Sequence, residues 1–400
     1  MRIGMILDQA FPPDIRVENE AVSLAQNGHD VFLFCYSYSN EEKSIKYRGI
    51  HLQRVRVSRY WIKKMRALVN VIPVYEAFLK KRIKRFIIKN DIDVMHVHDL
   101  YLLGVSLKVS RELGVPVVSD LHENYVEAIK TYNWANSFTG KMLTRPRRWE
   151  KLERKYLERV AHIIVTCKEY KKVLLHKYDF LNEKNIHVHL NVPDLYEFFS
   201  YEIDKKVLGG IEGFFIFYFG VIGERRGVFT CFDALKKIER ESNIKLLLIG
   251  PVDKGIASEF QSNLNDPQIK DRIIHYPWKD ISLIPSYINA SDICLSPLLK
   301  NGHHNTTIAN KVFQYMAMGK PLVVSDCKPQ QEIIEEENCG LVHEAGNVDD
   351  LAEKVMDLFN NPDLRQKMGE RGRKAVMEKY NLEKERKSII ALYDSIKLNS

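Results

Sequence analysis

Short apolar runs alternate with segments of helical period along the first half of the chain. The first run, residues 2–7, leads into a helical segment that Gly28 ends. Further strands are predicted at residues 31–35, 93–97, 116–119, 162–167 and 186–190, with helical segments before Gly114 and around residues 146–161. Repeated strand–helix units of this kind predict a parallel, doubly wound sheet.

A second series of the same kind follows a break in the periodicity. The break begins at Asn191-Val192-Pro193-Asp194 and lasts until Gly213. The strands of the second series are predicted at residues 214–219, 245–249, 273–276, 293–297 and 322–325. The fold class is therefore α/β, with two Rossmann-like, doubly wound domains in tandem.

The domain boundaries follow from these patterns. We assign residues 1–195 to the N-terminal domain and residues 196–379 to the C-terminal one. Two charged helical patterns, 363–379 and 382–397, meet at Tyr380-Asn381. We expect residues 380–400 to form a helix that packs back on the N-terminal domain.

Composition narrows the class of protein. The 400 residues are 45% hydrophobic, and no apolar run approaches the ~20 residues that span a bilayer. The apolar run at the N-terminus is too short for a signal peptide, so a cytoplasmic location is expected. The six cysteines stand singly, without a C-x-x-C pair, which favours reduced, buried thiols: Cys35, Cys167, Cys231, Cys294, Cys327 and Cys339.

Polar residues follow the N-terminal strands, at the edge where a doubly wound sheet binds ligands. After the first strand, Asp14 is predicted either to cap a helix or to contact a ligand, and Arg16 to lie near a phosphate. His96 and His98 share one face of a later strand, ahead of Asp99.

The next strand ends in a second cluster of the same kind, which contains Asp120, His122 and Glu123. Histidine and carboxylate side chains could ligate a metal, but no third element with matching spacing accompanies them. We therefore predict no metal site, and interpret the two clusters as a polar cleft floor that binds a hydroxylated ligand.

The C-terminal half carries residues suited to a phosphate. Gly220 begins a turn that continues to Arg225 and Arg226, and Gly250 begins a similar turn one strand later. Glycine lets backbone approach phosphate, and arginine pairs with its oxygens. Further along, a polar loop enters a helix, where Asn305, Thr306 and Thr307 suit a sugar, Lys311 a phosphate, and Gln314 the same ligand one turn onward.

Together these segments resemble the retaining family-4 glycosyltransferases of the GT-B fold, over nearly the whole chain. The similar segments are residues 11–17 (FPPDIRV), 95–100 (MHVHDL), 118–123 (VSDLHE), 225–227 (RRG) and 310–321 (NKVFQYMAMGKP). The resemblance implies two domains facing a cleft, with a nucleotide-sugar bound chiefly by the C-terminal domain and the acceptor chiefly by the N-terminal one.

The resemblance also implies roles for single residues. Arg226 and Lys311 neutralise the donor diphosphate without metal or other cofactor, and His98 hydrogen-bonds the donor sugar. Retention is attributed in this family to front-face attack, with the leaving phosphate deprotonating the acceptor. Residues expected to position the acceptor are Asp14, Arg16, Asp99, His122 and Glu123, while loops near Gly250 and Trp278 select the base.

One departure from the family pattern concerns its two glutamates, which are replaced here by Thr306 and Gln314. The amide of Gln314 can still accept one ribose hydrogen bond and donate another. We therefore expect weakened rather than abolished donor binding.

Basic residues are concentrated in the N-terminal half of a chain whose net charge is +8. Residues 60–90 mix nine lysines and arginines with apolar side chains, including Leu68 and Val69, and residues 145–149 add a second basic run. Such a stretch suits the surface of an anionic bilayer, although a solvated helix face explains it as well. No recognition motif indicates nucleic acid.

These observations predict a cytoplasmic, peripherally membrane-attached, metal-independent glycosyltransferase. Its substrates are a UDP- or GDP-sugar donor and a glycan or lipid-linked acceptor, in the assembly of surface polysaccharide, lipopolysaccharide or another glycolipid. Two alternatives stay open. One is a nucleotide-sugar epimerase of the same fold. The other is an inactive, transferase-like binding subunit, which the missing carboxylates at Thr306 and Gln314 suggest.

Overall fold

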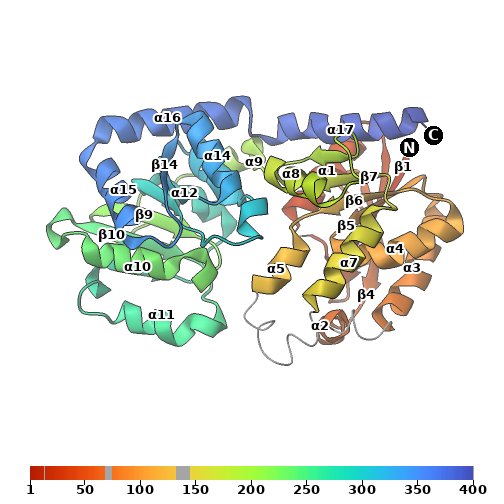
Figure 1. The fold of residues 1–400 in the computed structure, drawn as a ribbon, viewed down its shortest axis with the longest axis horizontal. Helices are drawn as coiled ribbons and strands as arrows, with labels where there is room; N and C mark the ends of the chain where they lie inside the picture. Colours follow the sequence, from red (N-terminus) through yellow and green to blue (C-terminus); the bar gives the residue numbers. More distant parts are fainter. Residues whose placement is uncertain (13, 68–73, 132–144, 400) are drawn as a thin grey trace. The chain divides into compact units, whose positions relative to one another are not determined.

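The computed structural model describes residues 1–12, 14–67, 74–131 and 145–399. It divides into two compact units (Figure 1). The N-terminal unit comprises Met1–Leu190 together with Glu383–Ser400, and the C-terminal unit comprises Asn191–Leu382. The chain first passes from the N-terminal to the C-terminal unit after Leu190, five residues before the boundary predicted at 195. The reason is that residues 191–194 already lead into a helix of the C-terminal unit, which Asp194 caps.

The N-terminal unit is built on one eight-stranded sheet of order β3-β4-β2-β1-β5-β6-β7-β8. Its strands are β1 (Arg2–Ala10), β2 (Asp30–Ser37), β3 (Ser44–Tyr47), β4 (Ile50–Arg56), β5 (Val94–His98), β6 (Val117–Leu121), β7 (His162–Val165) and β8 (Ile186–Val188). All neighbours pair in parallel except β3 and β4. The carboxyl ends of seven strands therefore meet at one edge.

The hairpin of β3 and β4 was not predicted from the sequence. Residues Arg48 and Gly49 connect the two strands with positive φ angles of 46° and 91°. Two consecutive positive φ values are typical of the tight turn that joins antiparallel strands. Strand β3 lies at the edge of the sheet and is largely exposed, so it lacks the apolar alternation by which strands are recognised.

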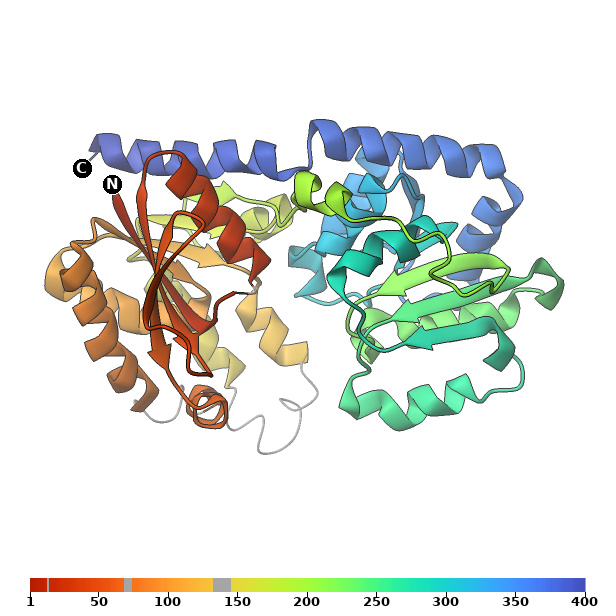
Figure 2. The ribbon, with the colours of Figure 1, turned by 180° about the vertical axis from the view of Figure 1, so that it is seen from behind.

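Helices cover both faces of this sheet, as the ribbon seen from behind shows (Figure 2). They are α1 (Ile15–Gln26), α2 (Arg59–Ala67), α3 (Val74–Asn90), α4 (Leu100–Leu113), α5 (Tyr125–Thr131), α7 (Pro146–Leu157), α8 (Lys168–Lys177) and α17 (Leu382–Asn399). The last of them, α17, buries Ile389, Leu392 and Tyr393 in the same core as Val17 and Leu24 of α1. The end of the chain thus completes the N-terminal unit.

The C-terminal unit contains a six-stranded parallel sheet of order β11-β10-β9-β12-β13-β14. Its strands are β9 (Phe214–Phe219), β10 (Ile244–Ile249), β11 (Ile273–Tyr276), β12 (Ile293–Ser296), β13 (Leu322–Ser325) and β14 (Gly340–His343). Its α-helices are α9 (Leu195–Ser200), α10 (Val228–Lys237), α11 (Ala257–Leu264), α12 (Ile284–Asn289), α13 (Asn310–Ala317), α14 (Lys328–Glu337), α15 (Val348–Asn360) and α16 (Pro362–Glu378). Two Rossmann-like domains in tandem are confirmed.

The basic stretch at residues 60–90 forms two helices, and residues 68–73 between them, including Leu68 and Val69, lie outside the described residues. The apolar stripe of α3 is buried in its own unit: Tyr75, Leu79, Ile83, Phe86 and Ile87. On α3, the apolar side chains of the amphipathic stretch therefore pack within the unit, against α4 and the sheet, which favours the alternative of a solvated helix face for its basic residues. On α2, Tyr60 and Trp61 are exposed. None of the described helices combines the length and apolarity needed to span a membrane.

Candidate functional site

In the C-terminal unit, glycines bring the ends of neighbouring strands together. Gly220 ends β9 with φ 120°, and Gly250 ends β10 with φ 146°. A Cβ atom on Gly250 would lie 2.0 Å from the carbonyl oxygen of Gly220, and one on Gly227 would lie 1.8 Å from the carbonyl oxygen of Pro297. Only glycine allows these approaches, which close the strand ends around the one-turn 3-10 helix Glu224–Arg226.

Lys311 lies in the first turn of α13, beside Gly220, and only 8% of its surface is exposed. Its Nζ lies 3.6 Å from the centre of the Tyr218 ring, and it would lie 3.4 Å from a Cβ atom on Gly220. Burial lowers the pKa of Lys311 well below its ordinary value, and the charge of Arg226 lowers it further. Among the described residues, no carboxylate pairs with Lys311. The position is therefore electropositive, enclosed and suited to an anion.

The loop before α13 is held by its own hydrogen bonds. The Thr306 hydroxyl donates to the carbonyl oxygens of Gly302 (2.7 Å) and His303 (3.1 Å), and Asn305 accepts a hydrogen bond from the Lys328 backbone N–H (3.3 Å). Arg225 donates to Nδ1 of His303 at 3.2 Å. Thr306 is buried and its hydroxyl proton is engaged within the loop, so its contact to the donor sugar stays a prediction.

Three further residues predicted to bind the donor differ in burial and in their position on the sheet. Thr307 follows the loop, and its hydroxyl oxygen is buried without a hydrogen-bond partner in the described part of the chain. Gln314 is half-buried on α13, one turn after Lys311. Trp278 follows β11 and is 55% exposed. Since β11 lies two strands from β9, the structure does not bring Trp278 into the group around Lys311.

In the N-terminal unit, Asp120 at the end of β6 is the centre of a buried charge network. Its Oδ1 accepts a hydrogen bond from the Arg16 guanidinium at 2.7 Å. Its Oδ2 lies 2.6 Å from Nε2 of His122 and 3.0 Å from Nδ1 of His98. Sequence analysis placed these residues at one edge of the sheet but did not identify Asp120 as the group that joins them.

Arg16 belongs to this network rather than to an open binding surface. Its guanidinium is buried and also lies 3.1 Å from Glu20 and 3.1 Å from the carbonyl oxygen of His189. Burial opposes its charge, but Asp120 and Glu20 raise the pKa of Arg16 above its ordinary value. The prediction that Arg16 meets a phosphate or the acceptor is therefore corrected: its side chain neutralises two buried carboxylates.

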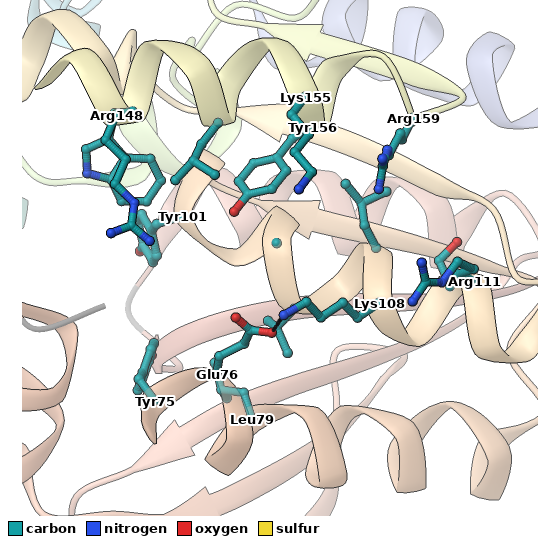
Figure 3. Close-up of a pocket in the computed structure, with 16 residues that line it drawn as sticks. Tyr75, Glu76, Leu79, Tyr101, Lys108, Arg111, Arg148, Lys155, Tyr156 and Arg159 are labelled. Carbon is teal, nitrogen blue, oxygen red and sulfur yellow. Dashed lines mark hydrogen bonds and ion pairs between the residues drawn. The ribbon is translucent and has the colours of Figure 1, made fainter. Parts of the chain in front are cut away.

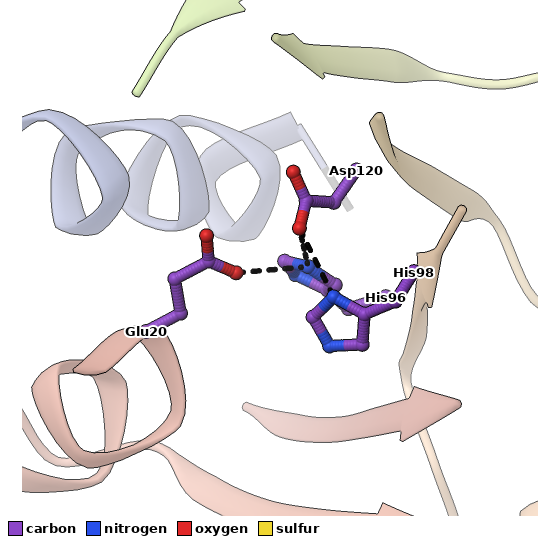
Figure 4. Close-up of side chains that lie close together, drawn as sticks. All are labelled: Glu20, His96, His98 and Asp120. Carbon is purple, nitrogen blue, oxygen red and sulfur yellow. Dashed lines mark hydrogen bonds and ion pairs between the residues drawn. The ribbon is translucent and has the colours of Figure 1, made fainter. Parts of the chain in front are cut away.

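Four side chains of the network lie as a metal site would place them (Figure 4). Glu20, His96, His98 and Asp120 each offer a ligand atom within 4.8 Å of the others, and all four are buried. Both carboxylates are already paired with Arg16, which a divalent cation would have to displace. His96 is also engaged, since its Nδ1 lies 2.7 Å from the Tyr393 hydroxyl. The donor set fits an internal ion-pair network better than a metal centre.

Asp99 and His122 form the outer side of the network. Burial lowers the pKa of His122, but Asp120 and Asp99 outweigh it and raise the value to about 10. Burial and the charge of Glu123 together raise the pKa of Asp99 to about 6, although the charge of His122 opposes the rise. Asp99 has φ 68°, a strained conformation for a residue other than glycine. His122, Asp99 and Glu123 are each partly exposed and can meet a ligand.

Asp14 caps α1, because its carboxylate accepts a hydrogen bond from the Val17 backbone N–H at 3.2 Å. This is the first of the two roles predicted for it. Close by, the end of β1 carries Asp8, which sequence analysis did not single out. Asp8 is buried and accepts hydrogen bonds from Arg66 (2.6 Å) and from the Tyr101 hydroxyl (2.9 Å).

Other members of the network were also missed by sequence analysis. Glu20 could have been found, because it stands four residues after Arg16 on one helix face. His189 follows β8, so the same strand-end rule that selected His98 applies to it. Tyr393 joins from α17, 297 residues along the chain from His96, and no local pattern indicates that contact.

The raised pKa of His122 predicts a pH dependence of stability. The folded value of about 10 exceeds the ordinary 6.5, so the His122–Asp120 pair stabilises the N-terminal unit fully below 6.5. This contribution is lost as the pH rises from 6.5 to about 10. Urea unfolding across this window should show a loss of stability that His122→Gln abolishes. An equal loss in the variant would assign the dependence to another group.

Comparison with known proteins places these two domains in a class. Residues 15–195 match the model of Glycosyltransferase Family 4, and residues 200–375 match that of Glycosyl transferases group 1. With two Rossmann-like domains and a buried cationic site in the second, the chain is a glycosyltransferase of the GT-B fold. The two matches together make it a family-4-like glycosyltransferase.

Individual relatives are distant in sequence. An uncharacterised glycosyltransferase of Methanocaldococcus jannaschii is 24% identical over 376 residues, which cover 92% of this chain and 90% of that one. The structure of sucrose-phosphate synthase from Thermosynechococcus elongatus aligns with a TM-score of 0.80 at 17% identity, covering all of both chains. Anabaena HepE in complex with UDP-glucose aligns with a TM-score of 0.73 at 13% identity, covering 99% of this chain and 100% of that one.

Proposed function

We propose that this glycosyltransferase moves a sugar from a UDP- or GDP-sugar to a glycan or lipid-linked acceptor, with retention and without a metal. The pathway we propose is the assembly of surface polysaccharide or a glycolipid, including lipopolysaccharide. The observation that carries the proposal is the buried ammonium group of Lys311, which the described residues leave without a counter-charge beside Arg226. A donor diphosphate supplies the missing anion.

The chemistry of the leaving group explains why the site suits such a donor. Negative charge develops on the diphosphate as the bond to the sugar breaks, and buried cations placed there stabilise it strongly. Lys311 and Arg226 thus fill the role that a divalent cation has in other transferases. HepE, which shares the fold, binds UDP-glucose, and this supports a UDP-sugar as the first donor to test.

His98 suits the contact to the donor sugar that its position in the family motif implies. Burial, together with the charge of His96, lowers the pKa of His98 to about 4, so the ring is neutral near pH 7. With Nδ1–H donating to Asp120, Nε2 is left as an acceptor. This Nε2 is buried and has no hydrogen-bond partner in the described residues. It can accept a hydrogen bond from a sugar hydroxyl.

Calorimetric titration with UDP, GDP, ADP, CMP and their sugar conjugates, in the presence of EDTA, tests the donor and the metal together. We expect one nucleoside diphosphate and its conjugates to bind selectively, with an affinity that added Mg²⁺ leaves unchanged. Binding only after a metal is restored would contradict the metal-independent mechanism. Failure of every nucleotide to bind would favour the inactive subunit.

The epimerase alternative is separated by what the protein does to the bound donor. An epimerase converts the donor sugar without an acceptor, whereas a transferase at most hydrolyses it slowly. Incubation of the selected nucleotide sugar with the protein alone, followed by NMR of the sugar, distinguishes the two. Appearance of an epimeric sugar would overturn the transferase proposal.

Within the basic stretch at residues 60–90, α2 is the described helix with strongly exposed aromatic side chains. Tyr60 and Trp61 are 60% and 62% exposed on this helix, and the Lys64 ammonium group lies 4.3 Å from the centre of the Tyr60 ring. Aromatic and basic side chains together suit a bilayer interface. We propose α2 as the contact to an anionic membrane, in place of the longer stretch predicted from the sequence.

A further inference from the structure

A cavity of about 620 Å³ lies between α3, α4 and α7 of the N-terminal unit (Figure 3). Five basic side chains line it, against one carboxylate, Glu76, which pairs with Lys108. The other four basic residues are Arg111, Arg148, Lys155 and Arg159. No carboxylate among the described residues pairs with Arg111, Lys155 or Arg159. The cavity is therefore strongly electropositive, and its charge is largely uncompensated.

The basic groups are spread along the cavity instead of being gathered at one point. Figure 3 shows Arg148 near one end, Lys108 and Lys155 in the middle, and Arg111 and Arg159 at the other end. Arg148 and Lys155 are seven residues apart on one helix, which is about 10 Å along its axis. A single phosphate group would leave most of these cations unpaired. Charges repeated at helical spacing on two walls match a ligand with several anionic groups along its length.

One end of the cavity adjoins the residues expected to position the acceptor. Tyr101 lines the cavity, and its hydroxyl donates hydrogen bonds to Asp8 at 2.9 Å and to Asp99 at 3.2 Å. Tyr75 lines the same end and donates to Asp8 at 2.5 Å. The two tyrosines thus form a wall shared by the cavity and the edge of the sheet where Asp99 lies. A chain held in the cavity would end close to that edge.

We propose that this cavity binds an acidic oligosaccharide, with its carboxylate or phosphate groups paired to the basic side chains of α4 and α7. Apolar and aromatic side chains between the cations, among them Leu152 and Tyr156, offer surface to the sugar rings. A lipid chain is the poorer fit, because an acyl chain has no anionic groups to pair with the basic side chains. The inference rests on the proposed function in one respect: the bound oligosaccharide is the acceptor class of the transferase.

Fluorescence anisotropy with a labelled oligogalacturonate at low salt tests the site directly. The variant Arg111→Gln/Lys155→Gln/Arg159→Gln removes three exposed cations, none of which is among the residues assigned to the donor. Because each exposed ion pair contributes modestly, we expect the affinity to fall about tenfold in total. The control Arg85→Gln/Lys89→Gln removes exposed cations of α3 that do not line the cavity, and it should change the affinity less than twofold.

The outcomes separate this inference from the proposed function. Equal loss in the control, binding of a neutral maltooligosaccharide of equal length, or binding of phosphatidylglycerol vesicles in place of the oligogalacturonate would each overturn the cavity assignment. Both variants should bind the selected nucleotide sugar as the unmodified protein does. Loss of nucleotide-sugar binding in every form would contradict the proposed function and leave the anisotropy result to decide the cavity by itself.

Discussion

Replacing Lys311 by methionine is expected to weaken nucleotide-sugar binding by about 10- to 100-fold and to raise the melting temperature of the C-terminal unit. A hydrogen bond to a charged group contributes about 1.5–3 kcal/mol, which is the loss expected on binding. The gain in stability follows from burial, because an ammonium group removed from water without a counter-charge destabilises the folded state. Calorimetric titration and scanning calorimetry measure the two effects.

The lowered pKa of Lys311 adds a second signature. Since the diphosphate restores the pKa of Lys311, binding takes up a proton when the pH lies between the values of the free and the bound protein. Donor affinity therefore falls as the pH rises through this window. Titrating with the sugar conjugate isolates the effect, because both its phosphates are diesters and remain ionised near neutral pH.

Lys311→Arg is the matched control, because arginine keeps the charge at all accessible pH values. It should bind the donor while losing most of the proton uptake, which titration in buffers of different ionisation enthalpy measures. If Lys311→Met bound the nucleotide sugar normally, or lost stability as well as affinity, Lys311 would be a packing residue. The diphosphate would then have to be placed elsewhere.

The strand-end rule accounts for what the sequence could predict of the site. Gly220, Gly250 and Lys311 all follow from reading the residues after each C-terminal strand, and the structure brings the three together. His98 and His122 were found in the same way, and both hydrogen-bond to Asp120. These predictions succeed because parallel strands end at one edge, so local order along the chain implies neighbourhood in space.

The sequence does not show which partner each polar side chain hydrogen-bonds or pairs with. Threonine and arginine are both residue types that often bind ligands. Here the Thr306 hydroxyl hydrogen-bonds within its own loop, and Arg16 neutralises two buried carboxylates. The amphipathic stretch of α3 left two alternatives open for a related reason, because a helix face buried within its own unit has the same period as one that meets a membrane. Long-range packing decides each case.

Replacing Arg16 by methionine is expected to lower the free energy of unfolding of the N-terminal unit by about 3–5 kcal/mol. The change leaves Glu20 and Asp120 buried with one cation fewer, and removal of one partner from a buried ion pair has a cost of this size. Urea unfolding followed by tryptophan fluorescence measures it, since Trp149 is buried in this unit.

The double variant Arg16→Met/Glu20→Met should recover part of the loss, because it removes one of the two carboxylates that the single change deprives of their guanidinium partner. The deficit of the single variant relative to the unmodified protein should shrink as the pH falls, because without Arg16 the pKa values of Glu20 and Asp120 rise and their protonation costs the folded state less. A loss below about 1 kcal/mol would show that the network does not depend on Arg16. The guanidinium would then be available for the ligand that sequence analysis assigned to it, and acceptor binding by the Arg16→Met variant would have to be measured.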